Sequence, residues 1–419
     1  MSSLTLIGAH RAVSELLENR PKSWDVVRFK GLFERLDRRN VDLAYEMLSL
    51  RSTGEVVARA EMGGRQEPDE SSLPKYLVAE IDDLVVNPMW LIGGGIGVSR
   101  RAGAVSPDYR VFRSHGALHP RFVHHLLRSQ PYLDQYLLYT RAQTTFDRRV
   151  QQSDLDNLPL PVPPLEEQRA IADYLDRETV RIDTLIEEQQ RLIEMLRERR
   201  RLAITNAIPP RPSVGSGADK LGRTARIGNG STPRRENRAY WDGGDVPWLN
   251  SSVVNQTRVH SAVEFTTAAA LAECHLPIVP PGSVLVGLTG QGKTRGMATI
   301  LDIEATVNQH LAYVTPDRAK WWPDYLLWLL TAAYDDLRRI SEENGSTKGG
   351  LTCEALKQLR VIIPPIDEQR RIAFHLDERT AKTDTLIAET ERFIELARER
   401  RSALITAAVT GQIDVREVA

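Results

Sequence analysis

Two long segments of the chain carry the same spacing of apolar residues. Between Leu165 and Ile208 no Gly or Pro occurs, and apolar residues recur at alternating steps of three and four. This spacing is typical of the buried seam of a coiled coil. Acidic Glu166 and Glu167 near the start and basic Arg199–Arg201 near the end complement the helix dipole. The pattern predicts a helix of about 43 residues, roughly 65 Å long.

The second segment is a duplicate of the first. Pairing residues 160–208 with 361–409, a shift of 201, gives 25 identical residues in 49 positions. A helix this long cannot bury its stripe against one small domain, so we expect the two copies to pack together, antiparallel about a two-fold axis. In the alternative, each helix lies along its own domain. That arrangement does not explain why the two helices have the same length. The expected seam residues are Ile171, Leu175, Ile182, Leu185, Leu192, Leu196, Ile372, Leu376, Leu386 and Phe393.

The segments before each helix differ from one another and read as mixed structure. Strand-like patches at 76–86, 89–99, 246–254, 282–290 and 311–316 are broken by Gly, Pro, Asn and Asp. One helix is expected after the strands of each segment, at 120–138 and 323–340. The fold class is therefore α+β, with a pseudo-two-fold internal repeat. The expected divisions are 1–159, 160–209, 210–359, 360–410 and a tail at 411–419.

Composition narrows the class of protein. The chain has 419 residues, which favours two or more domains. No apolar run reaches the length of a membrane span and the first 20 residues lack a signal-peptide pattern, so we expect a cytoplasmic protein without membrane contact. Cys274 and Cys353 form no CxxC pair and have no His cluster beside them, which argues against disulfides and zinc. The net charge of −1 means that any DNA-binding charge must be concentrated locally.

Such local concentrations exist in both mixed segments. Residues 100–150 are rich in Arg, and basic residues also cluster between 220 and 260 among Gly, Ser, Thr and Asn. Basic loops with polar side chains provide phosphate contacts and base-edge donors together, although a solvated mixed-charge surface would look the same for any single Arg. The candidate DNA-binding residues are Arg100, Arg101, Arg110, Arg113, Arg148, Arg149, Arg234, Arg235, Arg238, Gln291, Lys293, Thr294, Arg295 and Lys348.

Several motifs suggest enzymatic functions as alternatives. Residues Gly287–Thr294 match the GxxxxGK[ST] phosphate loop, but Gly296 follows where a helix should begin, and 295–301 reads as another strand. The Gly93–Gly97 run lacks a βαβ unit. The Pro-Pro pairs do not fit the (N/D)PP(Y/F) tetrad of amino-methyltransferases, and no PD-(D/E)xK nuclease core is discernible. We therefore expect no catalytic residues and no metal site.

Nearly the whole chain resembles one family. Residues 163–172 (PPLEEQRAIA), their copy from Pro364, the ending 405–415 (ITAAVTGQIDV), and Gly230–Pro233 with Tyr240-Trp241 and 246–248 (VPW) are similar to Type I restriction–modification specificity subunits. The first mixed segment departs from the family, with no G-x-T-P opening after Trp24.

The resemblance implies two target-recognition domains joined by antiparallel coiled-coil helices that read a bipartite, asymmetric site in double-stranded DNA. It implies a non-catalytic chain without cofactors, whose partners are two modification (methyltransferase) subunits and restriction subunits. S-adenosylmethionine, ATP and Mg would be bound by those partners. A P-loop NTPase acting on DNA and a coiled-coil adaptor without DNA contact are the competing hypotheses.

Overall fold

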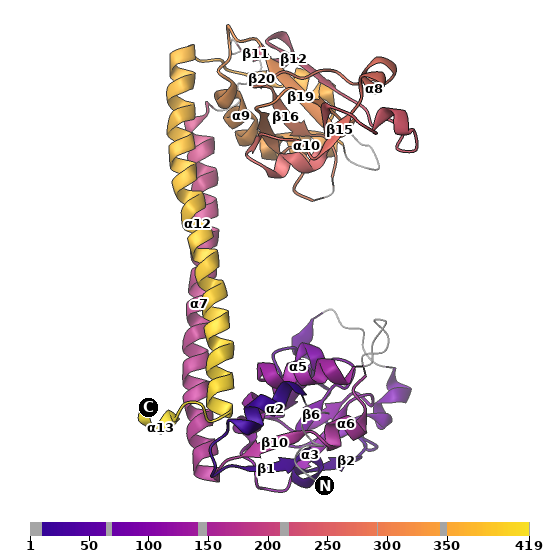
Figure 1. Cartoon of the computed structure of the whole chain (residues 1–419), viewed down its shortest axis with the longest axis vertical. Coiled ribbons are helices and arrows are strands. Elements are labelled where there is room, and N and C mark those ends of the chain that lie inside the picture. The colour runs from indigo at the N-terminus through magenta and orange to yellow at the C-terminus, as the bar shows by residue number, and fades with distance from the viewer. Residues whose placement is uncertain are drawn as a thin grey trace. The chain divides into compact units, whose positions relative to one another are not determined.

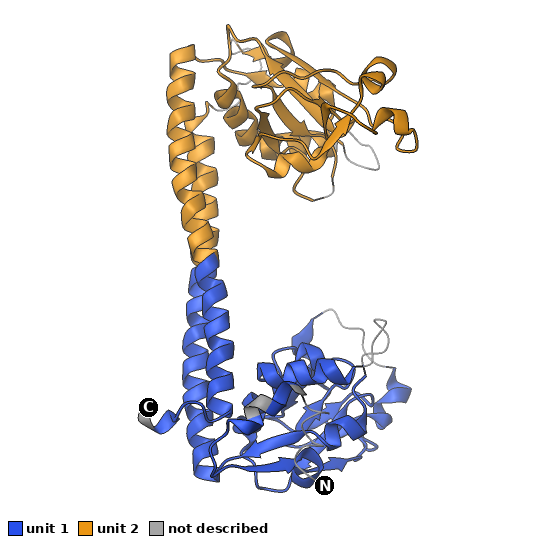
Figure 2. Cartoon of the chain, in the orientation of Figure 1, with its two compact units in different colours: residues 1–190, 392–419 blue, residues 191–391 orange. Residues whose placement is uncertain are grey.

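A computed structural model describes residues 11–63, 69–140, 149–209, 218–290, 292–343 and 350–418. The chain divides into two compact units, residues 1–190 with 392–419, and residues 191–391 (Figure 2). Each unit contains one mixed domain and a part of both long helices. The α+β class expected from the sequence is confirmed.

The first mixed domain is built on an antiparallel sheet with the strand order β2-β9-β6-β7. Smaller pairs are β3-β4 and β5-β8, and β1 pairs with β10, so that the first and last strands of the domain lie side by side. The strands are β1 Asp25–Arg28, β2 Phe33–Leu36, β3 Leu48–Leu50, β4 Val56–Ala58, β5 Leu77–Ala79, β6 Leu84–Val86, β7 Ile96–Val98, β8 Gly103–Val105, β9 Arg110–Ser114 and β10 Pro159–Val162. The helices are α2 Arg11–Glu18, α3 Phe29–Leu32, α4 Pro120–Leu127, α5 Gln130–Tyr139 and α6 Gln152–Asp156.

The second mixed domain has a five-stranded sheet, β12-β19-β16-β17-β14, and a three-stranded sheet, β15-β13-β18. As in the first domain, its first and last strands pair, here β11 with β20. The strands are β11 Asp219–Lys220, β12 Ala225–Asn229, β13 Val246–Leu249, β14 Arg258–Val259, β15 Glu264–Thr266, β16 Val284–Gly287, β17 Ala298–Leu301, β18 Thr306–Val307, β19 Leu311–Pro316 and β20 Arg360–Val361. The helices are α8 Ala268–Glu273, α9 Pro323–Ala332, α10 Tyr334–Glu343 and α11 Cys353–Lys357.

The two long helices are α7 (Leu165–Ala207) and α12 (Ile366–Val409), and they lie side by side (Figure 1). Their bounds match the helix expected from the apolar spacing. In the first unit Asp183 of α7 pairs with Arg401 of α12 at 2.9 Å, and in the second unit Asp384 of α12 pairs with Arg200 of α7 at 2.8 Å. These two ion pairs occupy equivalent positions of the repeat, because each residue is shifted by 201 from its counterpart. Within each unit the two helices are therefore antiparallel, and their contacts follow the 201-residue repeat.

Each unit packs its domain and its helices around one apolar core. In the first unit, Phe112 and Phe122 of the domain share a cluster with Leu175 of α7 and Ile405 of α12. In the second unit, Trp321 and Tyr325 share a cluster with Ile204 of α7 and Leu376 of α12. The tail adds α13 (Val415–Val418), and Val415 is buried in the first cluster.

Several details differ from the sequence expectation. The patch 76–86 forms two strands, β5 and β6, that belong to different sheets, and only Ile96–Val98 of the patch 89–99 is a strand. The single helix expected in each domain is a pair, because Ser129 takes an extended conformation as the N-cap of α5 ahead of Pro131, and α10 restarts with Asp335 and Asp336 in its first turn. The strand expected at 246–254 ends at Leu249. The Asn250 side chain then accepts a hydrogen bond from Ser252 N at 2.9 Å and turns the chain into a 3₁₀ helix over Ser251–Asn255.

Candidate nucleic-acid interface

At several positions the residue buried between the long helices is the one that follows the residue expected in the seam. Four apolar pairs adjoin the seam, and in each pair the second residue is the less exposed: Leu185-Ile186, Leu192-Ile193, Leu386-Ile387 and Phe393-Ile394. Adjacent residues on a helix point about 100° apart, so only one of each pair can face the partner helix. Ile171, Leu175, Ile182 and Leu376 are buried as expected, and Leu192, Leu196 and Ile372 are half-buried. Leu185, Leu386 and Phe393, expected in the seam, are instead exposed.

Four of the nine exposed large apolar residues of the two helices form two repeat-related pairs. Leu185 and Leu386 are 36% and 49% exposed, and Met195 and Leu396 are 63% and 52% exposed. Each member is shifted by 201 from its counterpart. The first unit carries Leu185 with Leu396, and the second carries Leu386 with Met195. We call these four residues the paired apolar surface; each unit carries one residue of each pair.

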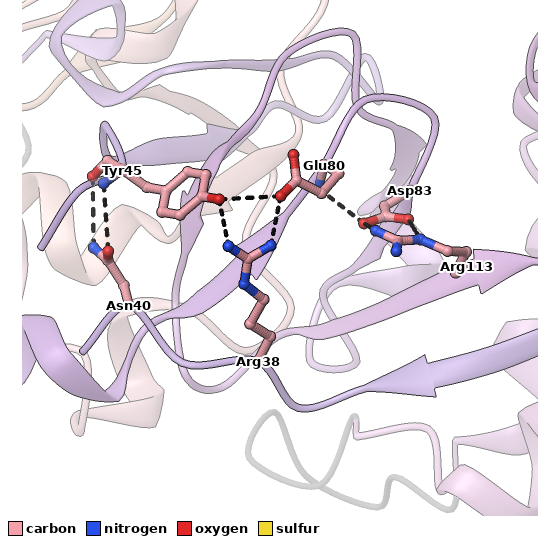
Figure 3. A network of polar contacts seen from close by, with 6 residues as sticks. All are labelled: Arg38, Asn40, Tyr45, Glu80, Asp83 and Arg113. Atoms are coloured by element: carbon pink, nitrogen blue, oxygen red, sulfur yellow. Dashed lines mark hydrogen bonds and ion pairs between the residues drawn. The ribbon is translucent and has the colours of Figure 1, made fainter. Parts of the chain in front are cut away.

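In the first domain, Arg113 is held by a polar network (Figure 3). Its guanidinium donates to both oxygens of Asp83 at 2.8 Å. Asp83 is 1% exposed, and it also accepts a hydrogen bond from Glu80 N at 2.8 Å. Glu80 in turn accepts from Arg38 at 2.7 Å and from the Tyr45 hydroxyl at 3.1 Å. The hydrogen bonds to Asp83 raise the pKa of Arg113. Arg113 thus fixes the turn between β5 and β6 while half of its side chain remains open to solvent.

The other first-domain candidates differ in exposure. Arg100 and Arg101 are exposed, and Arg101 pairs with Glu61 at 3.1 Å. Arg149 is exposed and lies 4.0 Å from Asp108. Arg110 is buried, donates to the carbonyl of Val150 at 3.1 Å, and has its pKa lowered by burial. Arg110 therefore faces the interior. Arg148 lies outside the described residues.

In the second domain the basic loop after β12 contains an aromatic stack. The Arg235 guanidinium lies over Trp241 at 4.1 Å and over Trp248 at 4.9 Å from the ring centroids, and it pairs with Glu264. Stacking and pairing together hold Arg235 in place. Arg234 and Arg238 are exposed beside it. Among the described residues, neither has an ion pair with an acidic side chain.

The loop with the GxxxxGK[ST] pattern connects two antiparallel strands. It leaves β16 at Gly287 and returns as β17 from Ala298, so a strand stands where a phosphate loop requires a helix. Lys293 is exposed. Thr294 is half-buried, and Arg295 is buried with an ion pair to Glu342 at 3.1 Å. Gln291 and Lys348 lie outside the described residues.

Beside Lys293 the second unit has a cleft of about 540 Å³. Its lining includes Lys293, Gln256 and the α7 residues Arg197 and Arg201. Arg197 pairs with Glu194 and Glu391, and Arg201 pairs with Glu198 and Asp335. Arg200, which also lines the cleft, pairs with Asp384. For Lys293, by contrast, no acidic partner is found within the described part of the chain. Lys293 is therefore the cation of this cleft that is available to an anion.

Sequence reasoning missed a polar cluster on three loops of the second domain. The Thr232 hydroxyl donates to Gln309 Oε1 at 2.7 Å, and Gln309 Nε2 donates to His310 Nε2 at 3.2 Å. His310 Nδ1 then carries the ring proton and donates to Thr289 Oγ1 at 3.0 Å. Thr232 belongs to the Gly230–Pro233 motif, but Gln309 lies 77 positions further along the chain, and no sequence pattern indicates that the two residues are in contact. The cluster links the loops that follow β12 and β16 to the loop that precedes β19.

Neither a metal centre nor a membrane span is found in the described ranges. They contain no group of three or more His, Cys, Asp or Glu side chains placed to hold a metal ion. Within the same ranges, no helix is both long and apolar enough to cross a bilayer.

The comparisons with known proteins agree on one family. The sequence profile described as Type I restriction modification DNA specificity domain matches residues 108–195 and 219–396, more than half of the chain. The chain is 22% identical over 181 residues to the Type I restriction enzyme EcoR124I/EcoR124II specificity subunit of Escherichia coli. That alignment spans 43% of this chain and 45% of the relative, so the chain matches less than half of the relative's length.

Solved structures share the fold. A chain from a structure of a type I R-M system has a TM-score of 0.76 at 18% identity, covering 94% of this chain and 100% of that one. The HsdS subunit from Thermoanaerobacter tengcongensis has a TM-score of 0.57 at 19% identity, covering 94% and 98%. Together with the duplicated helices and the two mixed domains, the profile match shows that the chain belongs to the family of Type I restriction–modification specificity subunits.

Proposed function

We propose that the chain binds double-stranded DNA and reads a split, asymmetric site, one part with each mixed domain. The observation that carries this proposal is the duplication itself. Matched helices join two domains whose sheets and loops differ, and dissimilar readers on a repeated spacer suit two different half-sites separated by uncontacted bases. The exposed cations Arg100, Arg234, Arg238 and Lys293 would contact phosphates.

Partner binding is the second half of the proposal. Each unit carries one residue of each pair of the paired apolar surface, and exposed apolar side chains at repeat-related positions suit two copies of one partner. We assign this surface to two modification subunits, which would bring S-adenosylmethionine and the methylation chemistry. Restriction subunits would supply ATP- and Mg-dependent cleavage. The chain itself would contribute binding and no catalytic group.

Methylation mapping tests both halves. Long-read sequencing of the host genome, with and without this gene, should show one methylated motif that depends on the gene and consists of two different half-sites with a gap. A continuous motif or a perfect palindrome would contradict the split reading. Gel retardation of mixed DNA by the chain, with and without its partners, separates this proposal from an adaptor without DNA contact. The P-loop alternative is disfavoured by the hairpin at Gly287–Ala298.

A further inference from the structure

Each long helix begins with a fully buried glutamine that serves the adjoining domain. Gln168 is the fourth residue of α7 and Gln369 is the fourth residue of α12, and both are 0% exposed. They are shifted by 201 and thus are the same position of the repeat. An uncharged polar side chain that is buried so completely needs hydrogen-bond partners. If packing were its only role, an apolar residue would have a lower free-energy cost of burial at this position.

Both amides use the same three kinds of backbone partner. In the first unit, Gln168 Oε1 accepts from His119 N at 2.7 Å, and Nε2 donates to the carbonyls of Ala117 at 3.0 Å and Pro163 at 2.8 Å. In the second unit, Gln369 Oε1 accepts from Trp322 N at 2.8 Å, and Nε2 donates to the carbonyls of Lys320 and Pro364, each at 2.8 Å. One side chain therefore joins the start of the helix to the loop that enters the domain's own helix, α4 or α9.

A second attachment lies eight residues further along each helix. Asp176 accepts hydrogen bonds from His125 at 2.7 Å and from Arg121 at 2.9 Å, both on α4. Its counterpart Asp377 accepts from Trp328 Nε1 on α9 at 2.8 Å. The two attachments are about 12 Å apart along the helix axis. The donors at the aspartates differ between the units, whereas the glutamine contacts are the same in both.

The glutamine and aspartate contacts, together with the apolar core that the domain shares with the helices, hold the domain at one angle, and loss of the glutamine contacts loosens this attachment at the start of the helix. On a lever of about 29 Å, roughly twice the radius of gyration of a domain of about 140 residues, a rotation of about 7° moves the far surface by the 3.4 Å rise of one base pair. A small change of angle at the glutamine therefore covers the 3.4 Å translation to a half-site one base pair further away, and the turn of about 34° over that base pair is taken up by torsion of the DNA or by further rotation of the loosened domain.

Building on the proposed function, we infer that Gln168 and Gln369 are positioning residues that set the angle of each DNA-reading domain on its helix and so restrict the complex to one gap length. Gln→Met removes the hydrogen bonds at nearly constant volume, and Gln→Glu keeps the acceptor while losing the donor. Each variant should accept wrong gaps, while the sequence of each half-site stays the same.

The test uses the complex of the full chain with its own modification subunits. Initial methylation rates are measured on duplexes whose half-sites are separated by the native gap and by one base pair more or fewer. The expected result is at least a tenfold rise, in Gln168→Met and in Gln369→Met, of the rate at a shifted gap relative to the native gap. Gln190→Met, at an exposed position of the same helix, should leave this ratio unchanged.

A destabilised core provides the second control. Leu158→Ala removes a fully buried side chain of the first domain and should lower the rate at every gap without changing the ratio. The ratio does not depend on the amount of folded protein, so it separates positioning from stability. Gln168→Met should also speed hydrogen exchange at the His119 amide and leave the Trp322 amide protected, with the reverse pattern for Gln369→Met.

Two results would overturn the inference. If wild type methylates a split motif but every glutamine variant that folds keeps the wild-type ratio, the glutamines only stabilise the fold. If wild type methylates no split motif at all, the proposed function fails and this inference fails with it. Two equivalent positions and two substitutions at each keep the test available if one variant does not fold.

Discussion

Lengthening the helix pair should lengthen the gap between the half-sites in the recognised DNA. The number of residues to insert follows from the rise and turn of the helix pair compared with those of the DNA duplex. Residues 190 and 391 end the first-unit part of α7 and the second-unit part of α12, so insertions after them leave each unit's own contacts, including Asp183–Arg401 and Asp384–Arg200, in place. Repeating residues 184–190 and 385–391 adds one heptad to both helices and keeps the seam in phase.

The magnitude differs between one and three added heptads. One heptad adds about 10.5 Å, close to three base pairs at 3.4 Å each. DNA turns by about 34° per base pair, hence by about 103°, whereas the helix pair turns by only about 20° in the left-handed sense. Three heptads add about 31.5 Å, or roughly nine base pairs. Nine base pairs turn the duplex by about 51° less than a full turn, which is equivalent to a left-handed rotation of about 51°. Three heptads turn the helix pair by about 60° in the left-handed sense, so the two rotations nearly match.

The three-heptad variant should therefore methylate a motif with the original half-sites and a gap about nine base pairs longer. The one-heptad variant should lose methylation at every gap, because its second domain meets the wrong side of the duplex. Long-read methylation sequencing of cells that carry each variant measures both outcomes. Four residues added to both helices is the control for assembly, since four residues break the heptad and should prevent partner binding. A three-heptad variant that kept the original gap would refute the idea that the helices set the spacing.

Three further predictions concern individual side chains. Lys293→Ala should weaken DNA binding and reduce the salt slope by about one, without any effect of nucleotide, and stoichiometric ATP binding lost in this variant would contradict it. Leu185→Asp with Leu386→Asp should abolish co-purification with the modification subunits while the chain's melting temperature stays within a few degrees; unchanged co-purification would exclude this surface. Burial, with the charges of His125 and Arg128 nearby, lowers the pKa of His124 to about 3, so the neutral ring stabilises the fold fully above pH 6.5 and progressively less as the pH falls towards 3. His124→Phe should flatten that decline, which reaches about 1.4 kcal/mol per pH unit, in urea unfolding followed between pH 4 and 7.

Local patterns were enough to predict the helices, the repeat and the fold class. The bounds of α7 and α12 follow from an uninterrupted apolar spacing and from charges that complement the helix dipole, and both are properties of neighbouring residues. The hairpin at Gly287–Ala298 was likewise recognisable, because Gly296 stands where a phosphate loop needs its first helical turn. Pairing of the helices followed from the length of the stripe, which one small domain cannot cover, and the antiparallel direction followed from the two-fold relation expected between the copies.

Only the tertiary structure decided which member of each apolar pair faces the seam and which arginines reach solvent. Leu185 and Ile186 are equally apolar neighbours, and the choice between them depends on how the partner helix approaches. Arg110 and Arg113 lie on one strand, yet Arg110 is buried and Arg113 pairs with Asp83, 30 residues away. Gln168 looks like an ordinary polar residue of a helix start, and its partners at Ala117 and His119 are about 50 positions distant. Contacts between residues far apart in sequence depend on the packing of whole elements, because no local spacing encodes which loop will close over a given side chain.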